Sequence, residues 1–323
     1  MRVGVVTPAT AGARNGNRVT ALRWARCLRA LGHEVVLRER YEGEPLDVLI
    51  ALHARRSAAS IERFARESAA RAGGRRWLVV ALTGTDLYGD LTSDAAARRS
   101  VDLATRLVLL QPLGRSRLPA GAVEKARVIR QSACAARDPI RPPAGTFRVC
   151  VLGHLRAVKD PFLAASASRL LPRSSAIEVL HLGGALDEES RSRALREVEE
   201  NPRWHWLGAR PRREALRLLA GSSVLALTSV SEGGANAVTE AIAASVPVIS
   251  TRIEGSLGIL GEDHPGYFPV GDARALADLW LRCEADEGFL AELRGRSVGL
   301  RPMVDPLREK EAWGALLEEV RGG

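Results

Sequence analysis

Two carboxylates and two glycines in the second half of the chain have the spacing of a binding site. Glu232 directly precedes Gly233 and Gly234, and Glu240 follows eight positions after Glu232, inside a run over 235–244 that predicts a helix. Glycines let a ligand approach the backbone closely, and the free N–H groups of a helix's first turn bind anions. Two acceptors flanking an anion site suit a ligand with hydroxyls at each end and phosphate in the middle. A nucleotide sugar has this form.

Positively charged residues nearer the middle of the chain would complement such a ligand. Lys159 and Arg156 follow a predicted strand that ends at Leu152, and the only other lysines are Lys125 and Lys310. A lysine retained in so arginine-rich a sequence indicates a chemical need. Fixed cations that bind a departing diphosphate more strongly in the transition state lower the barrier to its release. No pair of metal-binding Asp residues is apparent, so we expect no metal and no cofactor.

The elements around these residues predict two α/β domains. Short apolar runs alternate with helical segments, which is typical of buried parallel strands joined by helices. The clearest linker is the Pro-rich, polar stretch over 137–145. We therefore predict an N-terminal domain over 1–140, a C-terminal domain over 146–305, and a last helix over 306–323 that crosses back to the first domain. Strands are predicted over 3–7, 33–37, 48–52, 77–82, 107–111, 126–130, 147–152, 177–182, 224–228 and 246–250.

Polar residues follow several strands of the first half. In an open α/β sheet the carboxyl ends of the strands line the ligand crevice, so these residues are candidates for holding a second substrate. Arg18 beside Asn17 would suit a small anion. Each candidate also has a structural alternative. Arg18 could be a surface arginine beside a helix cap, His53 could be a core histidine, and Thr85 or Asp86 could cap a helix. The candidates are Asn17, Arg18, Thr20, His53, Thr85, Asp86 and Tyr88.

The spacing Glu-x7-Glu, followed by an Ala-rich helix and the strand at Val246-Pro247-Val248, resembles the retaining GT-B glycosyltransferases of the GT4 type. The resemblance covers essentially the whole chain. It implies an α/β fold of two Rossmann-like, doubly wound parallel-sheet domains with an interdomain cleft. It also implies that Glu232 holds the transferred sugar and Glu240 the nucleotide ribose.

The resemblance extends to the cationic segment, with one departure. Where the family has Gly-Arg-Leu and a lysine five residues after the arginine, this chain has His154 in place of the arginine, and Lys159 matches the lysine. Either His154 or Arg156 then supplies the second positive group, and Arg156 is favoured. The implied catalytic residues are Lys159, Arg156 and Glu232. The implied donor-binding residues are Gly16, Gly183, Arg210, Gly233, Gly234, Ala235, Glu240, Ser256 and Leu257. Of these, Ser256 and Leu257 are expected in a loop over 252–261.

Two runs resemble a narrower group. The sequence from Gly16 to Trp24 and the run TGTDLY from Thr83 to Tyr88 resemble the selenosugar synthases of selenoneine biosynthesis, which join a UDP-sugar to selenophosphate. The resemblance implies UDP-N-acetylglucosamine or UDP-glucose as donor, selenophosphate as acceptor and a 1-seleno sugar as product. Selenophosphate synthetase and a downstream selenium-transferring enzyme would be its pathway partners. The sugar, the anomeric configuration and the oligomeric state stay open.

The composition of the chain limits the alternative functions. The net charge of +9 raises nucleic acid as a partner, but the arginines are dispersed along the 323 residues, so a nucleic-acid-binding protein is a remote alternative. A GT4-type enzyme with a hydroxyl or thiol acceptor is the nearer one. Four scattered cysteines without a CxxC pair predict reduced thiols and no metal site. The first residues enter a strand without a signal peptide, and no apolar run is long enough to span a membrane, so we expect a cytoplasmic enzyme.

Overall fold

The computed structural model describes residues 1–10, 12, 15–70 and 76–322 and divides into two units. The first comprises Met1–Gln131, Glu232–Gly234 and Pro306–Gly323, and the second comprises Ser132–Ser231 and Ala235–Asp305. Part of the loop expected over 8–17 lies outside the described residues.

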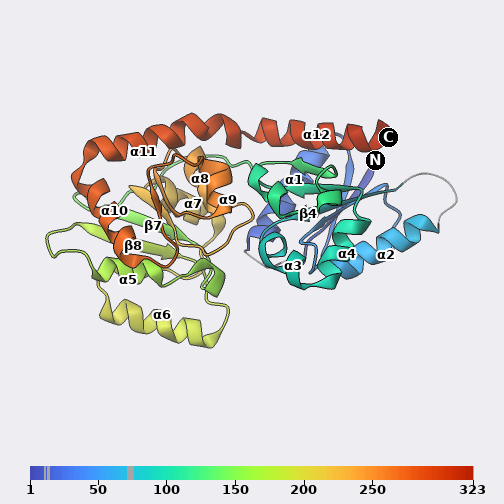
Figure 1. Ribbon diagram of the computed structural model, residues 1–323. Helices are drawn as coiled ribbons and strands as arrows, with labels where there is room; N and C mark the ends of the chain where they lie inside the picture. Colours follow the sequence, from blue (N-terminus) through green and yellow to red (C-terminus); the bar gives the residue numbers. More distant parts are fainter. Residues whose placement is uncertain (11, 13–14, 71–75, 323) are drawn as a thin grey trace. The chain divides into compact units, whose positions relative to one another are not determined.

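The first unit is built on a parallel sheet, which has six strands in the described part of the chain (Figure 1). The strand order is β2-β1-β3-β4-β5-β6, so the sheet grows in both directions from β1 and β3. This is a doubly wound topology, with the switch of direction between β1 and β3. The strands are β1 (Arg2–Val6), β2 (Glu34–Arg38), β3 (Val48–Leu52), β4 (Trp77–Leu82), β5 (Arg106–Leu109) and β6 (Ala126–Val128).

Helices cover both faces of this sheet because successive side chains of a strand point to opposite faces. In β3, Leu49 and Ala51 belong to a cluster with Phe64 of α2, whereas Val48 and Ile50 pack in the cluster of α1 and α12. The helical segments are α1 (Gly16–Ala30), α2 (Ala58–Ala69), the π-helical turn η1 (Asp86–Asp90), α3 (Leu91–Ser93), α4 (Ala95–Leu103), the 3-10 turns η2 (Pro112–Arg117) and η3 (Ala120–Ala122), and α12 (Pro306–Gly322).

The last helix, α12, belongs to the first unit through its contacts with α1. Trp313 of α12 and Trp24 of α1 are both fully buried, and their rings meet edge to face with centroids 4.8 Å apart. The carboxylate of Glu309, buried in this interface, accepts a hydrogen bond from Trp24 Nε1 at 2.8 Å and pairs with Arg23 at 2.9 Å. The charge of Glu309 is therefore compensated where it is buried.

The second unit repeats the architecture with a parallel sheet in the order β12-β11-β10-β7-β8-β9. Its switch of direction lies between β7 and β10, which are neighbours in the sheet. The described residues form β7 (Phe147–Leu152), β8 (Ile177–Leu182), β9 (Trp204–Trp206), β10 (Val224–Leu227), β11 (Val248–Thr251) and β12 (Tyr267–Phe268). The helical segments are η4 (Ala157–Lys159), α5 (Leu163–Arg169), α6 (Glu188–Glu200), α7 (Arg212–Ala220), α8 (Asn236–Ala243), α9 (Glu254–Leu260), α10 (Ala273–Ala285), α11 (Glu287–Leu300) and η5 (Arg301–Val304).

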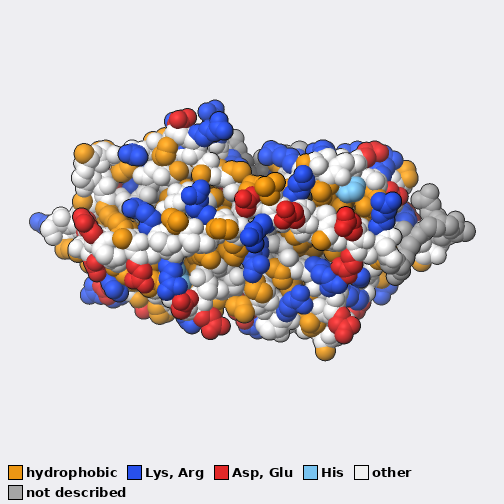
Figure 2. Space-filling model, turned by 90° about the horizontal axis from the view of Figure 1, so that it is seen from above, with side chains coloured by type: hydrophobic (Ala, Val, Ile, Leu, Met, Phe, Trp, Pro, Cys, Tyr) orange, Lys and Arg blue, Asp and Glu red, His pale blue; other side chains and the backbone are white. Residues whose placement is uncertain are grey.

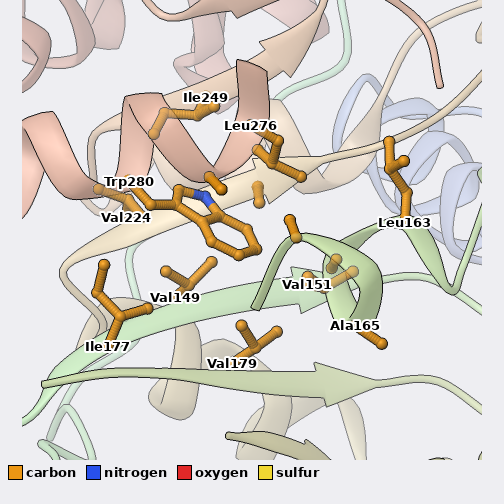
Figure 3. Close-up of a cluster of buried hydrophobic side chains, with 14 of the residues drawn as sticks. Val149, Val151, Leu163, Ala165, Ile177, Val179, Val224, Ile249, Leu276 and Trp280 are labelled. Carbon is orange, nitrogen blue, oxygen red and sulfur yellow. The ribbon is translucent and has the colours of Figure 1, made fainter. Parts of the chain in front are cut away.

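One face of the second sheet packs around Trp280 of α10 (Figure 3). The indole is fully buried, and aliphatic side chains from three neighbouring strands lie against it. These strands supply Val149 and Val151 of β7, Ile177 and Val179 of β8, and Val224 of β10. The opposite face carries α7, α8 and α9. Helices thus pack on both faces of the sheet and hold its strands in place.

The fold predicted from the sequence, two doubly wound parallel sheets with helices, is confirmed. The predicted strands over 48–52, 77–82, 147–152 and 177–182 coincide with β3, β4, β7 and β8. The expectation of a loop over 252–261 was wrong, because Glu254–Leu260 forms helix α9. In the described part of the chain, no helix has both the length and the apolar character that crossing a membrane requires.

Candidate functional site

In the second unit, the loops that follow β7 and β10 begin side by side at the switch point of the sheet, where doubly wound folds bind ligands. The loop after β7 contains the 3-10 turn η4, which ends at Lys159. The hydroxyl of Thr228 donates a hydrogen bond to the Lys159 carbonyl at 2.7 Å, and the Val230 N–H donates to the Val158 carbonyl at 2.9 Å. These bonds tie the two loops together and fix the backbone that carries Lys159.

The loop after β7 is also bonded to the turn after β8. Gly184 N–H donates to Nδ1 of His154 at 3.0 Å, and Leu155 N–H donates to the Gly184 carbonyl at 3.0 Å. The Nδ1 of His154 thus acts as a hydrogen-bond acceptor for the turn after β8. Gly183 is required here, since a Cβ at this position would overlap the Gly153 carbonyl. The residue at the position of the family's arginine thus makes a structural contact here, and Arg156 lies three residues before Lys159.

Glu240 lies in the second turn of α8 and its side chain is almost completely buried. Arg212, the first residue of α7, reaches it with Nη1 2.6 Å from Oε1. Arg210 is exposed, and its Nε donates to the Leu207 carbonyl at 3.0 Å. The segment from the end of β9 to the start of α7 therefore carries two arginines. One of them, Arg212, pairs with Glu240, the residue predicted to bind the ribose.

The two predicted donor residues of α9 lie in a helix instead of a loop. Ser256 is fully buried, and its hydroxyl accepts a hydrogen bond from the Ser250 hydroxyl at 2.7 Å. The N–H groups of Ser256 and Leu257 both donate to the Ile253 carbonyl at 2.9 Å. In this structure their polar groups are engaged within the protein, so α9 supports the site and does not present a loop to it.

In the first unit, His53 directly follows β3 and adopts a left-handed backbone conformation, with φ of 72°. Its ring is buried and its Nε2 lies 3.2 Å from Oγ1 of Thr85. The Arg56 N–H donates to Nδ1 at 3.4 Å, so the neutral ring carries its hydrogen on Nε2 and donates it to Thr85. Burial lowers the pKa of His53, an effect that the Asp86 and Asp90 carboxylates partly offset. His53 therefore orients the Thr85 hydroxyl.

The buried carboxylate of Asp86 organises the turn that contains Thr85. It accepts hydrogen bonds from the N–H groups of Gly84 at 2.8 Å, Thr83 at 3.1 Å and Ala54 at 3.0 Å. These contacts join the segments that follow β4 and β3. These bonds go to N–H groups that precede Asp86 in the chain, so its carboxylate ties two loops together and does not cap a helix.

The N-terminus of α1 carries the remaining group of predicted acceptor residues in the first unit. Asn15 caps the helix by accepting a hydrogen bond from the Arg18 N–H at 3.1 Å, and Gly16 and Asn17 lie in the first turn, partly or fully exposed. Thr20 is buried, and its Oγ1 accepts from Gln131 Nε2 at 2.6 Å. The first turn of α1 is thus partly exposed and carries the Arg18 guanidinium, while Thr20 is bonded to Gln131.

The remaining predicted residues lie near these elements. Tyr88 is partly exposed in η1, and its hydroxyl accepts a hydrogen bond from Gln111 Nε2 at 2.7 Å. Glu232 is partly exposed, and Glu232, Gly233 and Gly234 all group with the first unit although they follow β10 in sequence. Ala235 is the N-cap of α8 and is buried. Sequence reasoning missed Arg212 and Thr228; Thr228 could have been found from its place at the end of a predicted strand.

The surface gives no sign of a concentrated basic region on the face shown in Figure 2. Lys and Arg side chains there are scattered among acidic and hydrophobic ones. Among the described residues, no three His, Cys, Asp or Glu side chains are grouped as ligands for a metal ion.

Known proteins resemble this chain in both sequence and structure. The family model for glycosyl transferases group 1 matches residues 135–296, half of the 323-residue chain. The structure of HepE from Anabaena in complex with UDP and glucose has a TM-score of 0.80 at 16% identity, covering 99% of this chain and 100% of that one. Sucrose-phosphate synthase from Thermosynechococcus elongatus has a TM-score of 0.79 at 14% identity, covering 99% of each chain.

At these identities the structural matches establish the fold, which is that of the GT-B glycosyltransferases. Among curated proteins, none matches the chain. The family model spans the loop of Lys159, the Arg212–Glu240 ion pair and helix α9. The chain therefore belongs to the glycosyl transferases group 1 family.

Proposed function

We propose that this glycosyltransferase joins a UDP-sugar to selenophosphate and releases a 1-seleno sugar. The selenium atom would attack the anomeric carbon and form the C–Se bond, while the bond from that carbon to the diphosphate oxygen breaks and its electron pair leaves with UDP. Water would then attack phosphorus and break the P–Se bond, giving orthophosphate and the selenol. The donor would be UDP-N-acetylglucosamine or UDP-glucose.

The diphosphate and ribose contacts of the proposal rest on the second unit. Lys159 lies at the switch point on a backbone held by Thr228, where a cation would stabilise the diphosphate as charge develops on it. Arg156 is the proposed second cation. Glu240 would accept hydrogen bonds from the ribose, and Glu232 would bind the transferred sugar. The solved relative HepE is described in complex with UDP-glucose, which supports a uridine nucleotide here.

The observation that carries the acceptor assignment is the set of groups after β1, β3 and β4 of the first unit, three strands that are neighbours in its sheet. They combine the partly exposed first turn of α1, the Arg18 cation and the oriented hydroxyl of Thr85. N–H groups, a guanidinium and a hydroxyl are all donors, which suits a small, multiply charged anion such as selenophosphate. Thr20 and Asp86 would position these groups.

Arg18 provides the sharpest test of the acceptor. We expect Arg18→Ala to raise the KM for selenophosphate by about tenfold, because it removes one charge-assisted contact, and to leave the KM for the UDP-sugar within about twofold. Arg26→Ala, an exposed arginine of the same helix, is the matched control. Equal effects of the two substitutions would show that Arg18 is not part of the acceptor site.

An acceptor panel distinguishes the nearest alternative, a group 1 enzyme with a hydroxyl or thiol acceptor. UDP release would be followed with selenophosphate, thiophosphate, a simple thiol and a sugar alcohol, each under anaerobic conditions. Selenophosphate should give the fastest release. Faster turnover with the thiol or the alcohol would replace the selenophosphate proposal with that alternative.

A further inference from the structure

A buried histidine lies directly beneath the loop that carries Lys159. His181 is the fifth residue of β8 and is 1% exposed. Its Nε2 lies 3.0 Å from the carbonyl oxygen of Gly153, the first residue after β7. Because a carbonyl oxygen can only accept, Nε2 must carry the hydrogen and donate it.

The ring reaches the other end of the same loop as well. His181, Pro161 and Lys159 line one small pocket at the carboxyl edge of the sheet, together with Gly153, Thr228 and Ser229. The segment from Gly153 to Pro161 therefore begins and ends beside one imidazole. On its other side the ring meets Trp204 edge to face, with centroids 5.5 Å apart, so the orientation of the imidazole is fixed by packing.

The charge state of the ring is set by its surroundings. Burial lowers the pKa of His181 to about 4, and the carbonyls of Gly153 and Pro161 oppose this shift only in part. The ring is therefore neutral at pH 7. It adds no positive charge beside Lys159, so its contribution there is geometric.

We propose that His181 is a positioning residue for Lys159: through its hydrogen bond to Gly153 it fixes the loop that presents the Lys159 ammonium group. The inference rests on the proposed role of Lys159 in stabilising the departing diphosphate. Thr228 fixes the same loop at the Lys159 carbonyl, so the loop after β7 is held from the two strands that flank β7, β8 and β10. Catalysis by a fixed charge requires such support, because a displacement of about 1 Å costs up to about a hundredfold in rate.

The chain contains a matched control. His264 is also buried at 4% exposed, its Nε2 lies 2.8 Å from the Val248 carbonyl, and its ring meets Tyr267 edge to face with centroids 5.2 Å apart. Its hydrogen bond supports the start of β11 and not the Lys159 loop. Substituting His264 therefore removes a comparable buried hydrogen bond from the same unit.

The experiment compares His181→Phe and His181→Gln with His264→Phe and His264→Gln in the full-length protein. Phenylalanine keeps a ring but removes the donor, whereas glutamine can place an amide N–H near the position of Nε2. We expect His181→Phe to lower kcat by about tenfold to a hundredfold with the KM for the UDP-sugar within about threefold, and glutamine to restore most of kcat. If the two Phe variants lose the same stability and the same kcat, His181 has only a structural role and the inference fails.

A second readout does not depend on turnover. Reductive methylation with ¹³C-formaldehyde labels the amino terminus and the chain's only lysines, Lys125, Lys159 and Lys310, and a Lys159→Arg variant assigns the Lys159 signal. His181→Phe should shift the Lys159 dimethylamine resonance and leave those of Lys125 and Lys310 unchanged. His264→Phe should move none of them. An unmoved Lys159 signal contradicts the inference. If the signal moves but the protein does not turn over UDP-sugars, the inference is supported and only the proposed function fails.

Discussion

Arg212 and Glu240 form an ion pair in which Nη1 lies 2.6 Å from Oε1, between a guanidinium that is 46% exposed and a carboxylate that is 6% exposed. The charge that compensates a nearly buried carboxylate thus reaches it from the solvent side. The pair joins the start of α7 to the second turn of α8, and it links the stability of this region to the proposed binding of ribose.

Substitutions of this pair should separate its two roles. Glu240→Ala should raise the KM for the UDP-sugar by about tenfold to a hundredfold, because hydrogen bonds to a charged acceptor are lost, and should change kcat little, because the ribose is remote from the bond that breaks. Steady-state kinetics check this. An unchanged KM would contradict the ribose assignment.

Arg212→Ala should lower the free energy of unfolding by about 1 kcal/mol, less than for a fully buried pair because the guanidinium is half exposed. Urea denaturation measures this change, with Arg213→Ala, the exposed neighbour on α7, as the control. In the double variant with Glu240→Ala, the effect of Arg212→Ala should disappear. Additive effects would mean that the ion pair contributes no coupling energy.

Lys159→Ala should lower turnover by about 10²–10³-fold, since it removes a fixed cation from the developing diphosphate charge. Lys125→Ala and Lys310→Ala control for the loss of a lysine, because these residues belong to the first unit and Lys159 belongs to the second. UDP release under saturating donor measures the effect. A folded Lys159→Ala protein that releases UDP at the normal rate would rule out the assignment.

The contact between α1 and α12 should dominate the stability of the first unit. Trp313→Ala removes a fully buried indole that meets Trp24, and it should lower the free energy of unfolding by about 3–5 kcal/mol. Urea denaturation followed by circular dichroism is the measurement, and Glu318→Ala, an exposed position of α12, is the control. Equal effects of the two substitutions would show that α12 is not required for this unit.

The cysteines should differ sharply in reactivity. Burial raises the pKa of Cys27 to about 11 and the pKa of both Cys150 and Cys283 to about 12, whereas Cys134 is exposed. Since the thiolate is the reactive form, a raised pKa keeps these three thiols protonated and slow to react until strongly alkaline pH. Iodoacetamide at pH 8 should therefore add one label, at Cys134, by mass spectrometry. Labelling of Cys27 at the rate of Cys134 would contradict this.

The sequence predicted the two sheets well because most of their strands are short, mainly apolar runs. Val48–Leu52 and Phe147–Leu152 are bounded by polar or glycine residues, and each was predicted with its observed bounds. Strand β9 was missed because Trp204–Trp206 is only three residues long and shows no clear pattern. Helix α9 was missed because Gly255 and Gly258 disfavour a helix, although packing of Ile259 and Leu260 in the core stabilises it.

The site was less predictable because its contacts join segments that are far apart in sequence. The pairing of Arg212 with Glu240 depends on how α7 packs on α8. The bond from His181 to Gly153 depends on the register of β8 against β7, in which Leu152 lies opposite Leu182. A polar residue in the apolar run of β8 was visible in the sequence, but its partner was not.

The most direct test of the account measures UDP release from UDP-N-acetylglucosamine and UDP-glucose, with and without selenophosphate under anaerobic conditions, and determines the mass of the product. The account predicts release that depends on selenophosphate and a product with the mass of a 1-seleno sugar. UDP release that is independent of selenophosphate, or its absence with both donors, would contradict the proposed reaction.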